Sequence, residues 1–479
     1  MGKQVWHINQ TPNWTLPLLA AGLTAACTLW QRRHPRSERP VPDGDPPKIV
    51  ILGGGFAGRG VAQELAKLLP RPEDGDITLV DEHNFLLFTP MLTEVAGGEL
   101  DADHITSSPH HLSRRVGFVQ GRIEQIDLNQ KHVKLTQEAE GSGTSPQSQI
   151  GQADHLVIAL GSVPNFHGIP GLREHSLQMK RLRDADAVRN RVLALLERAN
   201  AERDPAVRRR LLTFVVGGGG FTGVETMAAM NDLVRASVRF FPHIPLGEIQ
   251  TLLIHPGDRL LPELSPSLAA YAQKKLERRG VEVRLKTTIS GAGDGFVEIA
   301  GGTRIHTQTL VWAAGVTPSP VIATLDCQRG KHGGLTVDSS CRVPEHPGVW
   351  ALGDCAEVPQ PGSHHSYAPT AQNATREGRL VAQNIVAALQ GGQTRQFTFQ
   401  PIGELALVGR HSGVARVYGL NFSGVLAWAM WRLIYLVKMP DGRQRVRILL
   451  DWLLDVILGR PIVELPLAAQ HYRHLKQDG

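Results

Sequence analysis

Two short segments of the chain carry glycines at the spacing Gly-x-Gly-x-x-Gly. These glycines are Gly53, Gly55 and Gly58 in the first segment and Gly218, Gly220 and Gly223 in the second. In this pattern the first glycine makes a tight turn, the second lets the backbone approach a pyrophosphate, and the third lets a helix pack closely on a strand. The free N–H groups of that helix then face the phosphates. The chain therefore predicts two dinucleotide sites, and we expect FAD in one and a nicotinamide dinucleotide in the other.

The first segment has the strand and the helix that such a site needs. Residues 48–52 form an apolar, β-branched run that is typical of a buried parallel strand, and Phe56 and Ala57 lead into a helical pattern of apolar residues. A second strand, 77–80, ends in Asp81, about 20 residues beyond the glycines, where a carboxylate can accept hydrogen bonds from a ribose. The competing interpretation is a glycine-rich turn in an unrelated α/β fold, and this context argues against it.

The second segment has the same context but a different residue at the end of its second strand. Strand 212–216 precedes the glycines, Phe221 and Thr222 follow the second of them, and strand 250–254 ends at His255 instead of at an acid. An acid at that position binds the 2′-hydroxyl of NAD and repels the 2′-phosphate of NADP. Because His255 removes this repulsion, NADH and NADPH both remain open as the substrate.

Three further apolar segments resemble parts of flavoproteins that have two dinucleotide sites. Two of them end in Gly161 and Gly315 and resemble the strands that cross between the flavin and nicotinamide domains. The third, 349–354, ends in Asp354 and resembles the flavin-domain motif whose aspartate contacts the ribityl and pyrophosphate region of FAD. An aspartate after a strand can also be only a helix N-cap. Its position after both glycine segments favours the role in FAD binding.

Over residues 48–465 the chain resembles the type II NADH:quinone oxidoreductases, which do not pump protons. Beyond the glycine segments, the resemblance rests on residues 81–92, 370–374, 422–432 and 435–438. It implies an α/β fold with two Rossmann-like dinucleotide-binding domains, in which the NAD(P)H domain interrupts the FAD domain, plus a C-terminal membrane-associating helical region. It also implies hydride transfer from NADH, or from NADPH, to FAD and electron transfer to a membrane quinone.

The same resemblance suggests residues at the reaction centre. In the family, an Ala-Gln-x-Ala-x-Gln segment lies under the flavin and lines the quinone site; Ala371 and Gln372 match it, but the last position is Arg376. Arg376 can donate to a quinone oxygen and stabilise a reduced anionic quinone, or it can indicate another acceptor. Glu225 matches a glutamate near the reacting rings, which suggests nicotinamide positioning or a proton relay. Its alternative role is favourable charge in the first turn of a helix. Lys438 matches a lysine near the flavin and quinone end, and its alternative is a snorkelling interfacial lysine.

The two ends of the chain predict contact with a membrane. Residues 14–30 are apolar and precede a basic cluster at 31–36, so a span here would keep the catalytic domains on the cytoplasmic side. A flexible or interfacial leader is the alternative. Near the C-terminus, 426–437 is apolar but too short to span a bilayer, and 446–458 is amphipathic, as in a helix that lies in the membrane surface. A pair of helices packed on the core, or in a homodimer interface, is the alternative there.

These patterns divide the chain into five parts. We expect a leader and linker at 1–47, the first part of the FAD-binding domain at 48–165, the NAD(P)H-binding domain at 166–315, the second part of the FAD-binding domain at 316–400, and the C-terminal strand and helix region at 401–479.

Composition narrows the class of protein. The chain has 479 residues and a formal charge of +6, which suits an anionic membrane or an anionic cofactor. No basic tail and no zinc-ligand spacing points to nucleic acid or to a metal. The four cysteines are Cys27, Cys327, Cys341 and Cys355. None forms a Cys-x-x-Cys pair, which indicates a reducing compartment and argues against a disulfide reductase.

Three other functions share parts of this pattern. A sulfide:quinone oxidoreductase has the same fold but needs redox cysteines around the flavin, and no cysteine lies between Cys27 and Cys327. A nucleotide-sensing flavoprotein would hold a long-lived complex with little quinone turnover. A soluble ferredoxin or rubredoxin reductase would have no use for the apolar C-terminal segments.

Overall fold

The computed structural model describes residues 45–137, 147–363 and 365–464. The apolar leader at 14–30 and its basic flank lie outside the described residues, so their contact with a membrane stays a prediction. The architecture below is that of the unit that begins at Pro46.

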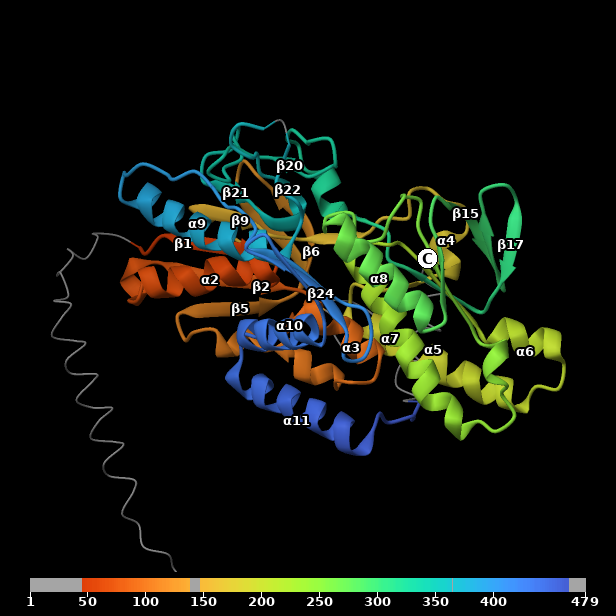
Figure 1. The fold of residues 1–479 in the computed structure, drawn as a ribbon. Coiled ribbons are helices and arrows are strands. Elements are labelled where there is room, and N and C mark those ends of the chain that lie inside the picture. The colour runs from red at the N-terminus through yellow and green to blue at the C-terminus, as the bar shows by residue number, and fades with distance from the viewer. Residues whose placement is uncertain (1–44, 138–146, 364, 465–479) are drawn as a thin grey trace, which may run out of the picture. The chain divides into compact units, whose positions relative to one another are not determined.

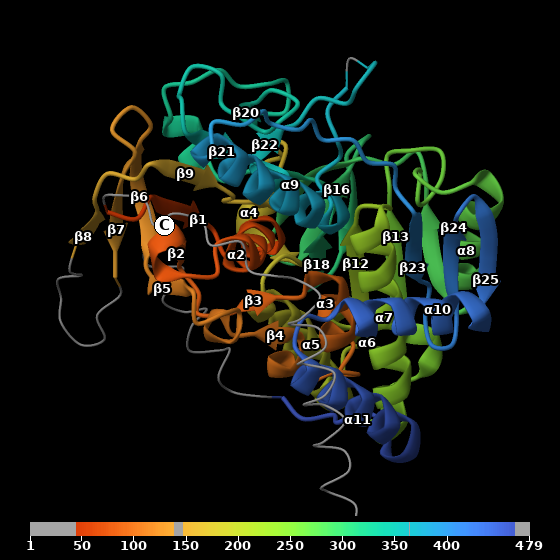
Figure 2. The same ribbon diagram turned by 90° about the vertical axis from the view of Figure 1, so that its left-hand side faces the viewer.

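A five-stranded parallel sheet carries the first glycine segment. Its strands lie in the order β21 (Val349–Ala351), β9 (His155–Ile158), β1 (Lys48–Leu52), β2 (Asp76–Asp81) and β5 (Val116–Gln120). The helices α2 (Phe56–Leu68) and α9 (Ala371–Leu389) pack closely against one another beside it, as Figures 1 and 2 show. Strands β9 and β21 are fully buried, as expected inside a parallel sheet.

A second five-stranded parallel sheet carries the second glycine segment. Its strands lie in the order β11 (Leu177–Gln178), β18 (Thr309–Trp312), β12 (Thr213–Gly217), β13 (Gln250–Ile254) and β14 (Val281–Arg284). The longer helices of this part are α5 (Leu182–Ala201), α7 (Phe221–Ser237) and α8 (Pro266–Arg278). Helix α7 continues directly from the glycine turn after β12, which places its N-terminus at the carboxyl edge of the sheet.

The chain leaves the first sheet after β9 and returns to it at β21, and the whole second sheet lies between these two points in the sequence. The outgoing strand β10 (Ser162–Pro164) and the returning strand β19 (Val316–Pro318) pair with one another in antiparallel fashion. The two predicted crossing segments therefore run side by side. The α/β fold with two parallel, Rossmann-like sheets is as predicted, whereas the four boundaries between the five parts remain a prediction.

The C-terminal part consists of an antiparallel sheet and two helices. Strands β23 (Gly403–Leu407), β24 (Gly413–Val417) and β25 (Leu420–Gly424) form the sheet, and α10 (Val425–Lys438) and α11 (Gly442–Leu458) follow it. Helix α10 packs against β24 and β25, and α11 lies beside α10 (Figure 2). Among the described residues, no helix is both long and apolar enough to cross a membrane.

Shorter elements complete the described fold. They are β3 (Leu86–Leu87), β4 (Thr106–Ser107), β6 (Arg122–Asp127), β7 (His132–Thr136), β8 (Gln147–Ile150), β15 (Ile289–Gly293), β16 (Phe296–Ile299), β17 (Thr303–His306), β20 (Leu335–Thr336), β22 (Ala356–Glu357), α3 (Leu92–Ala96), α4 (Leu172–His175), α6 (Pro205–Leu211), and the 3-10 turns η3 (Ala102–Ile105), η5 (Val238–Phe240) and η8 (Gly353–Cys355).

Candidate active site

The first glycine turn and the N-terminus of α2 form what we call the first cradle. Gly53 has φ +101°, and a Cβ on it would lie 2.3 Å from the carbonyl oxygen of Ala159. A Cβ on Gly58 would lie 1.9 Å from the carbonyl oxygen of Gly53, whereas a Cβ on Gly55 would meet nothing within 4 Å. Two of the glycines are thus required by the fold itself, and the third leaves open space at the helix N-terminus, as a pyrophosphate needs.

Asp81 closes the first cradle at the end of β2. Its Oδ2 accepts a hydrogen bond from the N–H of Gly54 at 2.6 Å, and its Oδ1 accepts one from the N–H of His83 at 2.7 Å. Asp81 lines a small cavity together with Arg59 and Phe85, among other residues. Because each carboxylate oxygen keeps a further lone pair, Asp81 can still accept from the hydroxyls of a ribose.

The second cradle, formed by the second glycine turn and the N-terminus of α7, repeats this geometry. Gly218 has φ +121°, and a Cβ on it would lie 2.6 Å from the carbonyl oxygen of Ala313. A Cβ on Gly223 would lie 1.8 Å from the carbonyl oxygen of Gly218, and Gly220 again faces open space. Phe221 and Thr222 begin α7 and are partly or fully exposed, as Phe56 is at the matching position of α2. Ala57, the next residue of α2, is buried.

His255 takes the place of Asp81 in the second cradle. The N–H of Gly219 donates a hydrogen bond to its Nδ1 at 3.1 Å. The ring is held tightly, since a Cβ on either Gly219 or Gly257 would lie 2.6 Å from a ring atom. Burial lowers the pKa of His255, although the nearby carboxylates of Glu263 and Asp258 oppose the shift. The hydrogen bond to Nδ1 assigns the ring proton of the neutral histidine to Nε2.

The crossing segments meet where the two sheets adjoin. Gly161 and Gly315 both have positive φ, +64° and +93°, and the chain continues from them into the paired strands β10 and β19. Asp354 lies in η8, directly after β21. Its Oδ2 accepts from the hydroxyl of Ser162 at 2.6 Å and lies 3.4 Å from Nζ of Lys180. The N-cap of η8 is Leu352, so Asp354 is not merely a capping residue.

Glu377, which the sequence analysis missed, supports this region from α9. It is buried, and its Oε2 accepts a hydrogen bond from the N–H of Gly353 at 2.8 Å. Burial raises the pKa of Glu377 to about 7, although this hydrogen bond opposes the shift. The periodicity of α9 could have revealed it, because Glu377 falls on the same helix face as the apolar residues Ala374 and Val381.

Glu225, in the first turns of α7, is a buried acid held by the C-terminal part. Its Oε1 accepts hydrogen bonds from the N–H of Leu407 in β23 at 2.9 Å and from Nε1 of Trp431 in α10 at 3.0 Å. Burial raises the pKa of Glu225 to about 8, and the two hydrogen bonds only partly oppose this. A pKa of about 8 favours the protonated carboxyl group at neutral pH, and Oε2, which accepts neither bond, is the oxygen available to carry the proton.

A series of aromatic rings connects Glu225 with the first cradle. Trp431 contacts Tyr435 with ring centroids 4.6 Å apart, Tyr435 faces Phe88 at 6.2 Å, and Phe88 faces Phe56 at 5.8 Å. Phe56 is the first residue of α2. Burial raises the pKa of Tyr435 well above its usual range, so its hydroxyl stays protonated. These contacts bring helices of both cradles into one apolar region.

Three predicted residues gather between α9 and α10. Gln372 donates from Nε2 to the carbonyl oxygen of Gly403 at 2.9 Å, and Arg376 donates from Nη1 to the carbonyl oxygen of Gln372 at 2.9 Å. The guanidinium carbon of Arg376 lies 4.0 Å from the ring centroid of Phe399. The pKa of Lys438 is lowered mainly by burial and also by the positive charge of Arg376. The two cations are therefore near one another. Ala371, the first residue of α9, precedes this group.

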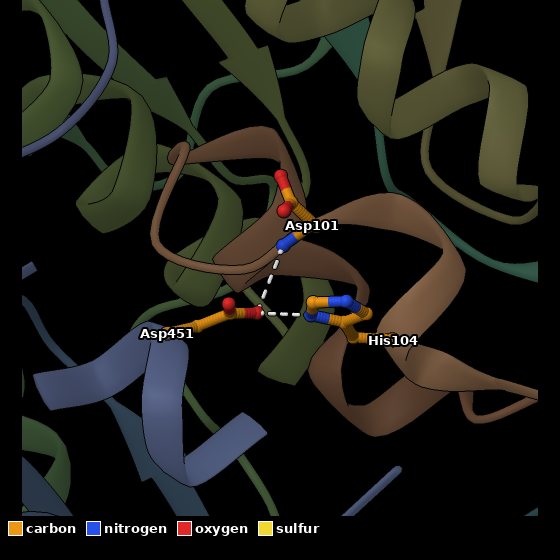
Figure 3. A group of neighbouring side chains, drawn as sticks. All are labelled: Asp101, His104 and Asp451. Atoms are coloured by element: carbon orange, nitrogen blue, oxygen red, sulfur yellow. Dashed lines mark hydrogen bonds and ion pairs between the residues drawn. The ribbon is translucent and has the colours of Figure 1, made fainter. Parts of the chain in front are cut away.

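Helix α11 is oriented in a way that the sequence alone did not show. Asp451 and Asp455 face the protein, whereas apolar side chains face outward. Figure 3 shows Asp451 accepting hydrogen bonds from the ring of His104 at 2.6 Å and from the backbone N–H of Asp101 at 3.3 Å. These three residues could also hold a cation. The contacts present are those that anchor α11 to η3.

A buried charge network anchors α10 as well. Arg432 donates from Nη2 to Glu94 at 3.1 Å and to Glu99 at 2.7 Å, and Arg460, beyond α11, also pairs with Glu99. Trp452 of α11 donates to Glu94 at 3.2 Å. Since Arg432 follows Trp431, this network fixes the register in which α10 meets Glu225.

The cysteines of the described chain offer no redox pair. Cys327, Cys341 and Cys355 are free thiols, and burial raises the pKa of each; that of Cys355 rises to about 12. Thiols held protonated in this way are poor nucleophiles. They therefore do not supply the chemistry that a sulfide:quinone oxidoreductase needs.

Comparisons with known proteins agree with this geometry. Residues 47–378 match the pyridine nucleotide-disulphide oxidoreductase family, and residues 402–461 match the NDH2 C-terminal domain. The type II NADH:quinone oxidoreductase NdhA of Mycobacterium tuberculosis is 31% identical over 441 residues, which cover 88% of this chain and 90% of that protein. A probable NADH dehydrogenase of Dictyostelium discoideum is 28% identical, covering 87% of this chain and 90% of that protein.

The fold also matches a solved structure, that of NDH2 from Plasmodium falciparum in complex with NADH. The TM-score is 0.79 at 20% sequence identity, and the match covers 88% of this chain and 100% of that one. With both family models and the mycobacterial relative spanning both cradles and the C-terminal helices, the chain belongs to the type II NADH:quinone oxidoreductase family.

Proposed function

We propose that the protein oxidises NADH, or NADPH, with FAD held in the first cradle, and that it reduces a membrane quinone without pumping protons. The observation that carries this proposal is the joining of two complete dinucleotide cradles by one buried apolar region around Glu225. The family supports the reaction, since its relatives are named NADH:quinone oxidoreductases. The free thiols, of which those of Cys341 and Cys355 are buried, disfavour a sulfide:quinone oxidoreductase.

The residues of the first cradle fit FAD, because Gly55 leaves the open space that a pyrophosphate needs and side chains at Gly53 and Gly58 would close the turn. Its predicted contacts are Gly53, Gly55, Phe56, Ala57, Gly58, Asp81, Gly161, Asp354 and Ala371. When bound, FAD supplies the two-electron acceptor that later delivers electrons to the quinone. The predicted contacts of the nicotinamide dinucleotide are Gly218, Gly220, Phe221, Thr222, Gly223, His255 and Gly315.

Glu225 is the proposed proton donor of the quinone half of the reaction. Quinone reduction to a quinol consumes two electrons and two protons, and Glu225 would supply one of these protons from Oε2. Reduced flavin, when bound, would supply the two electrons and the other proton. Burial of Glu225 favours the neutral acid, and the hydrogen bond from Trp431 opposes this only in part. A pKa near the working pH is what an efficient proton donor requires.

Arg376 and Lys438 are the proposed partners of the quinone head group. The positive charges of Arg376 and Lys438 repel one another when nothing is bound between them. They therefore stabilise the negative charge that develops on a quinone oxygen as it is reduced. Arg376 stands where the family pattern has glutamine, and its forked donors can still reach a carbonyl oxygen. Gln372, fixed by Gly403, holds the backbone oxygen that orients Arg376.

The exposed faces of α10 and α11 are the proposed membrane surface. Large apolar side chains are exposed on both helices: Val425, Leu426, Leu433, Val437, Val446, Leu449, Leu450, Leu453, Leu454, Val456, Ile457 and Leu458. Because Asp451 and Asp455 point inward, this face is apolar and suits a lipid surface. We propose a membrane-bound protein with its catalytic domains on the cytoplasmic side; a homodimer that covers part of this face is the alternative.

Anaerobic flavin absorbance tests the proposal. Protein purified in detergent is mixed with NADH or with NADPH and then with a short-chain quinone. We expect bleaching by the nucleotide and rapid recovery with the quinone, in a ping-pong scheme. Bleaching without recovery would reject the quinone, and a requirement for both substrates before any bleaching would reject the ping-pong order. Slow recovery with a long-lived charge-transfer band would favour the nucleotide-sensing alternative.

A further inference from the structure

Three arginines line an open pocket where α7 and α8 end. Arg235 is in the last turn of α7, Arg278 is the last residue of α8, and Arg279 and Gly280 follow it. Gly280 has φ +84°, and a Cβ on it would lie 2.2 Å from Nη2 of Arg235. The glycine therefore makes the space into which the guanidinium group of Arg235 fits.

The charges of this pocket are only partly neutralised by the protein. Arg279 forms an ion pair with the buried carboxylate of Asp232. Arg235 donates from Nε to Oδ1 of Asn231 at 3.1 Å, which orients the guanidinium group without neutralising it. Arg235 and Arg278 are exposed, and no carboxylate lines the pocket in the described chain. Arg279 is neutralised by Asp232 and lies near Glu99, whereas Arg235 and Arg278 keep their charges and favour an anion. Their forked donors match the oxygens of a phosphate.

Arg239, four residues beyond Arg235 of the pocket, lies beside the C-terminal end of α11. Nη2 of Arg239, in η5, is 3.6 Å from where a Cβ of Gly459 would be, and Gly459 directly follows α11. Burial lowers the pKa of Arg279 most, and the like charge of nearby Arg460 lowers it further. The last three residues of α11 are among its most exposed: Val456, Ile457 and Leu458, at 60, 66 and 75%. A cationic pocket thus adjoins an exposed apolar helix end.

We propose that this pocket binds the phosphate of an anionic phospholipid, whose acyl chains lie along the apolar end of α11. A phosphate joined to hydrocarbon matches the two neighbouring surfaces at once, which a free anion does not. Phe240 supports the same placement, since its ring is 53% exposed and lies 4.7 Å from the guanidinium carbon of Arg239. Exposed aromatic rings beside basic side chains are typical of the headgroup level of a membrane. The inference rests on the proposed membrane face of α10 and α11.

Vesicle binding by the full, flavin-loaded protein tests this assignment. Affinity is measured for vesicles of phosphatidylcholine alone and for vesicles that also contain phosphatidylglycerol. We expect the unchanged protein to bind the anionic vesicles roughly tenfold or more tightly, and the double variant Arg235→Gln with Arg278→Gln to lose most of this gain. The matched control is Arg122→Gln with Arg203→Gln, two exposed arginines outside the pocket that remove the same charge and are expected to keep the gain.

A second variant separates a built phosphate site from general attraction by charge. Arg235→Lys with Arg278→Lys keeps both charges but loses the forked donors. We expect it to bind anionic vesicles as weakly as the glutamine variant. Full binding by the lysine variant would overturn the proposed pocket, as would an equal loss in the Arg122 and Arg203 control. Oxidation of NADH by a short-chain quinone in detergent is expected to be unchanged in every variant, which shows that each is folded.

Two further outcomes distinguish failure of the phosphate pocket from failure of the proposed membrane face of α10 and α11. If the unchanged protein binds phosphatidylcholine vesicles but gains nothing from phosphatidylglycerol, the pocket proposal fails while the membrane face stands. If it binds neither kind of vesicle, the membrane face itself fails. Inorganic phosphate is titrated against the protein without vesicles; saturable binding that depends on Arg278, with no gain from anionic lipid, would assign the pocket to a free anion instead.

Discussion

The two cradles have nearly the same backbone but different side chains at their closing positions. In both, the first and third glycines are locked against carbonyl oxygens and the second faces open space. In both, the residue after the second strand accepts a hydrogen bond from the N–H of a cradle glycine, Asp81 from Gly54 and His255 from Gly219. What remains available to a ligand differs, since Asp81 keeps acceptor lone pairs whereas His255 keeps only the N–H donor at Nε2.

This difference shows that the fold and the choice of nucleotide are separable. A carboxylate and an imidazole nitrogen both anchor the glycine turn, so either residue satisfies the backbone. A carboxylate then attracts ribose hydroxyls and repels a phosphate, whereas a ring N–H is attracted to either. We therefore expect the second cradle to accept either NADH or NADPH. A cradle closed by a carboxylate, as Asp81 closes the first, would repel the 2′-phosphate of NADPH.

Substitution of the third glycine in each cradle is expected to have the largest effect and to show which dinucleotide each cradle binds. Gly58→Ala places a Cβ against the carbonyl oxygen of Gly53, and Gly223→Ala does the same at Gly218. We expect Gly58→Ala to yield protein without flavin, and Gly223→Ala to keep flavin but to lose bleaching by NADH about a hundredfold or more. Flavin content and anaerobic bleaching rates measure the two effects. The assignment of the cradles would be reversed if Gly223→Ala lost the flavin and Gly58→Ala kept it.

The second largest effect is expected at Glu225, which occupies the position that Gly60 has in the first cradle. Gly60 faces the backbone of Thr375 in α9, while Glu225 holds a proton. Glu225→Gln should lower quinone turnover about tenfold to a thousandfold and leave bleaching by NADH within about twofold. Stopped-flow measurements of the two half-reactions separate these outcomes, and an equal loss in both would place Glu225 with the nicotinamide instead.

The same variant has a consequence for stability. The folded protein keeps a proton on Glu225 up to a pKa of about 8, whereas the unfolded chain releases it near pH 4.5. The folded state thus binds the extra proton between these values, so this residue makes stability fall as pH rises, by about 1.4 kcal/mol per pH unit at most. Denaturant unfolding at several pH values should show a flatter dependence for Glu225→Gln than for the unchanged protein.

His255→Asp sharpens the comparison by giving both cradles the same closing residue. We expect the ratio of kcat/KM for NADPH to that for NADH to fall about tenfold or more, since the new carboxylate repels the 2′-phosphate. His255→Gln serves as the uncharged control and should change the ratio much less. An unchanged ratio in the aspartate variant would mean that His255 does not face the adenosine ribose.

The smallest effect is expected at Arg376, which lies in the second turn of α9. Arg376→Gln restores the family residue and removes one of the two neighbouring cations. We expect KM for quinone to change about three- to tenfold with little change in bleaching by NADH. Arg379→Gln, on the same helix, removes a charge of the same sign and serves as the control. A gain of quinone turnover in Arg376→Gln, together with a loss of turnover with another acceptor, would show that the arginine selects a different oxidant.

What the sequence predicted well was set by local backbone requirements. The glycine turns need residues without a Cβ, and they lie next to apolar strands, so Gly53 and Gly218 could be recognised from a few neighbours. The partners of Asp354 could not be. Ser162 and Lys180 are separated from it by 192 and 174 residues. Ser162 reaches Asp354 because β9 and β21 are neighbours in the first sheet, and Lys180 reaches it from beyond β11 of the second sheet.

The environment of Glu225 shows the same limit. Its position after the second glycine segment is plain in the sequence, but its two hydrogen bonds come from 182 and 206 residues further along the chain. Its raised pKa is a property of burial by these distant elements. The orientation of α11 was equally hidden, since a pattern of charges every fourth residue does not say whether Asp451 and Asp455 face water or the protein.

The hydrogen-bond partners of Glu225 lie far along the chain, so they are synthesised long after Glu225 itself. A nascent chain that has completed both parallel sheets still lacks Leu407 and Trp431, so its acid has neither partner. A ribosome must release nearly the whole polypeptide before this carboxyl group acquires its final surroundings. Unfinished copies can thus complete both parallel sheets and still lack the buried surroundings of Glu225 on which its proposed role as a proton donor depends.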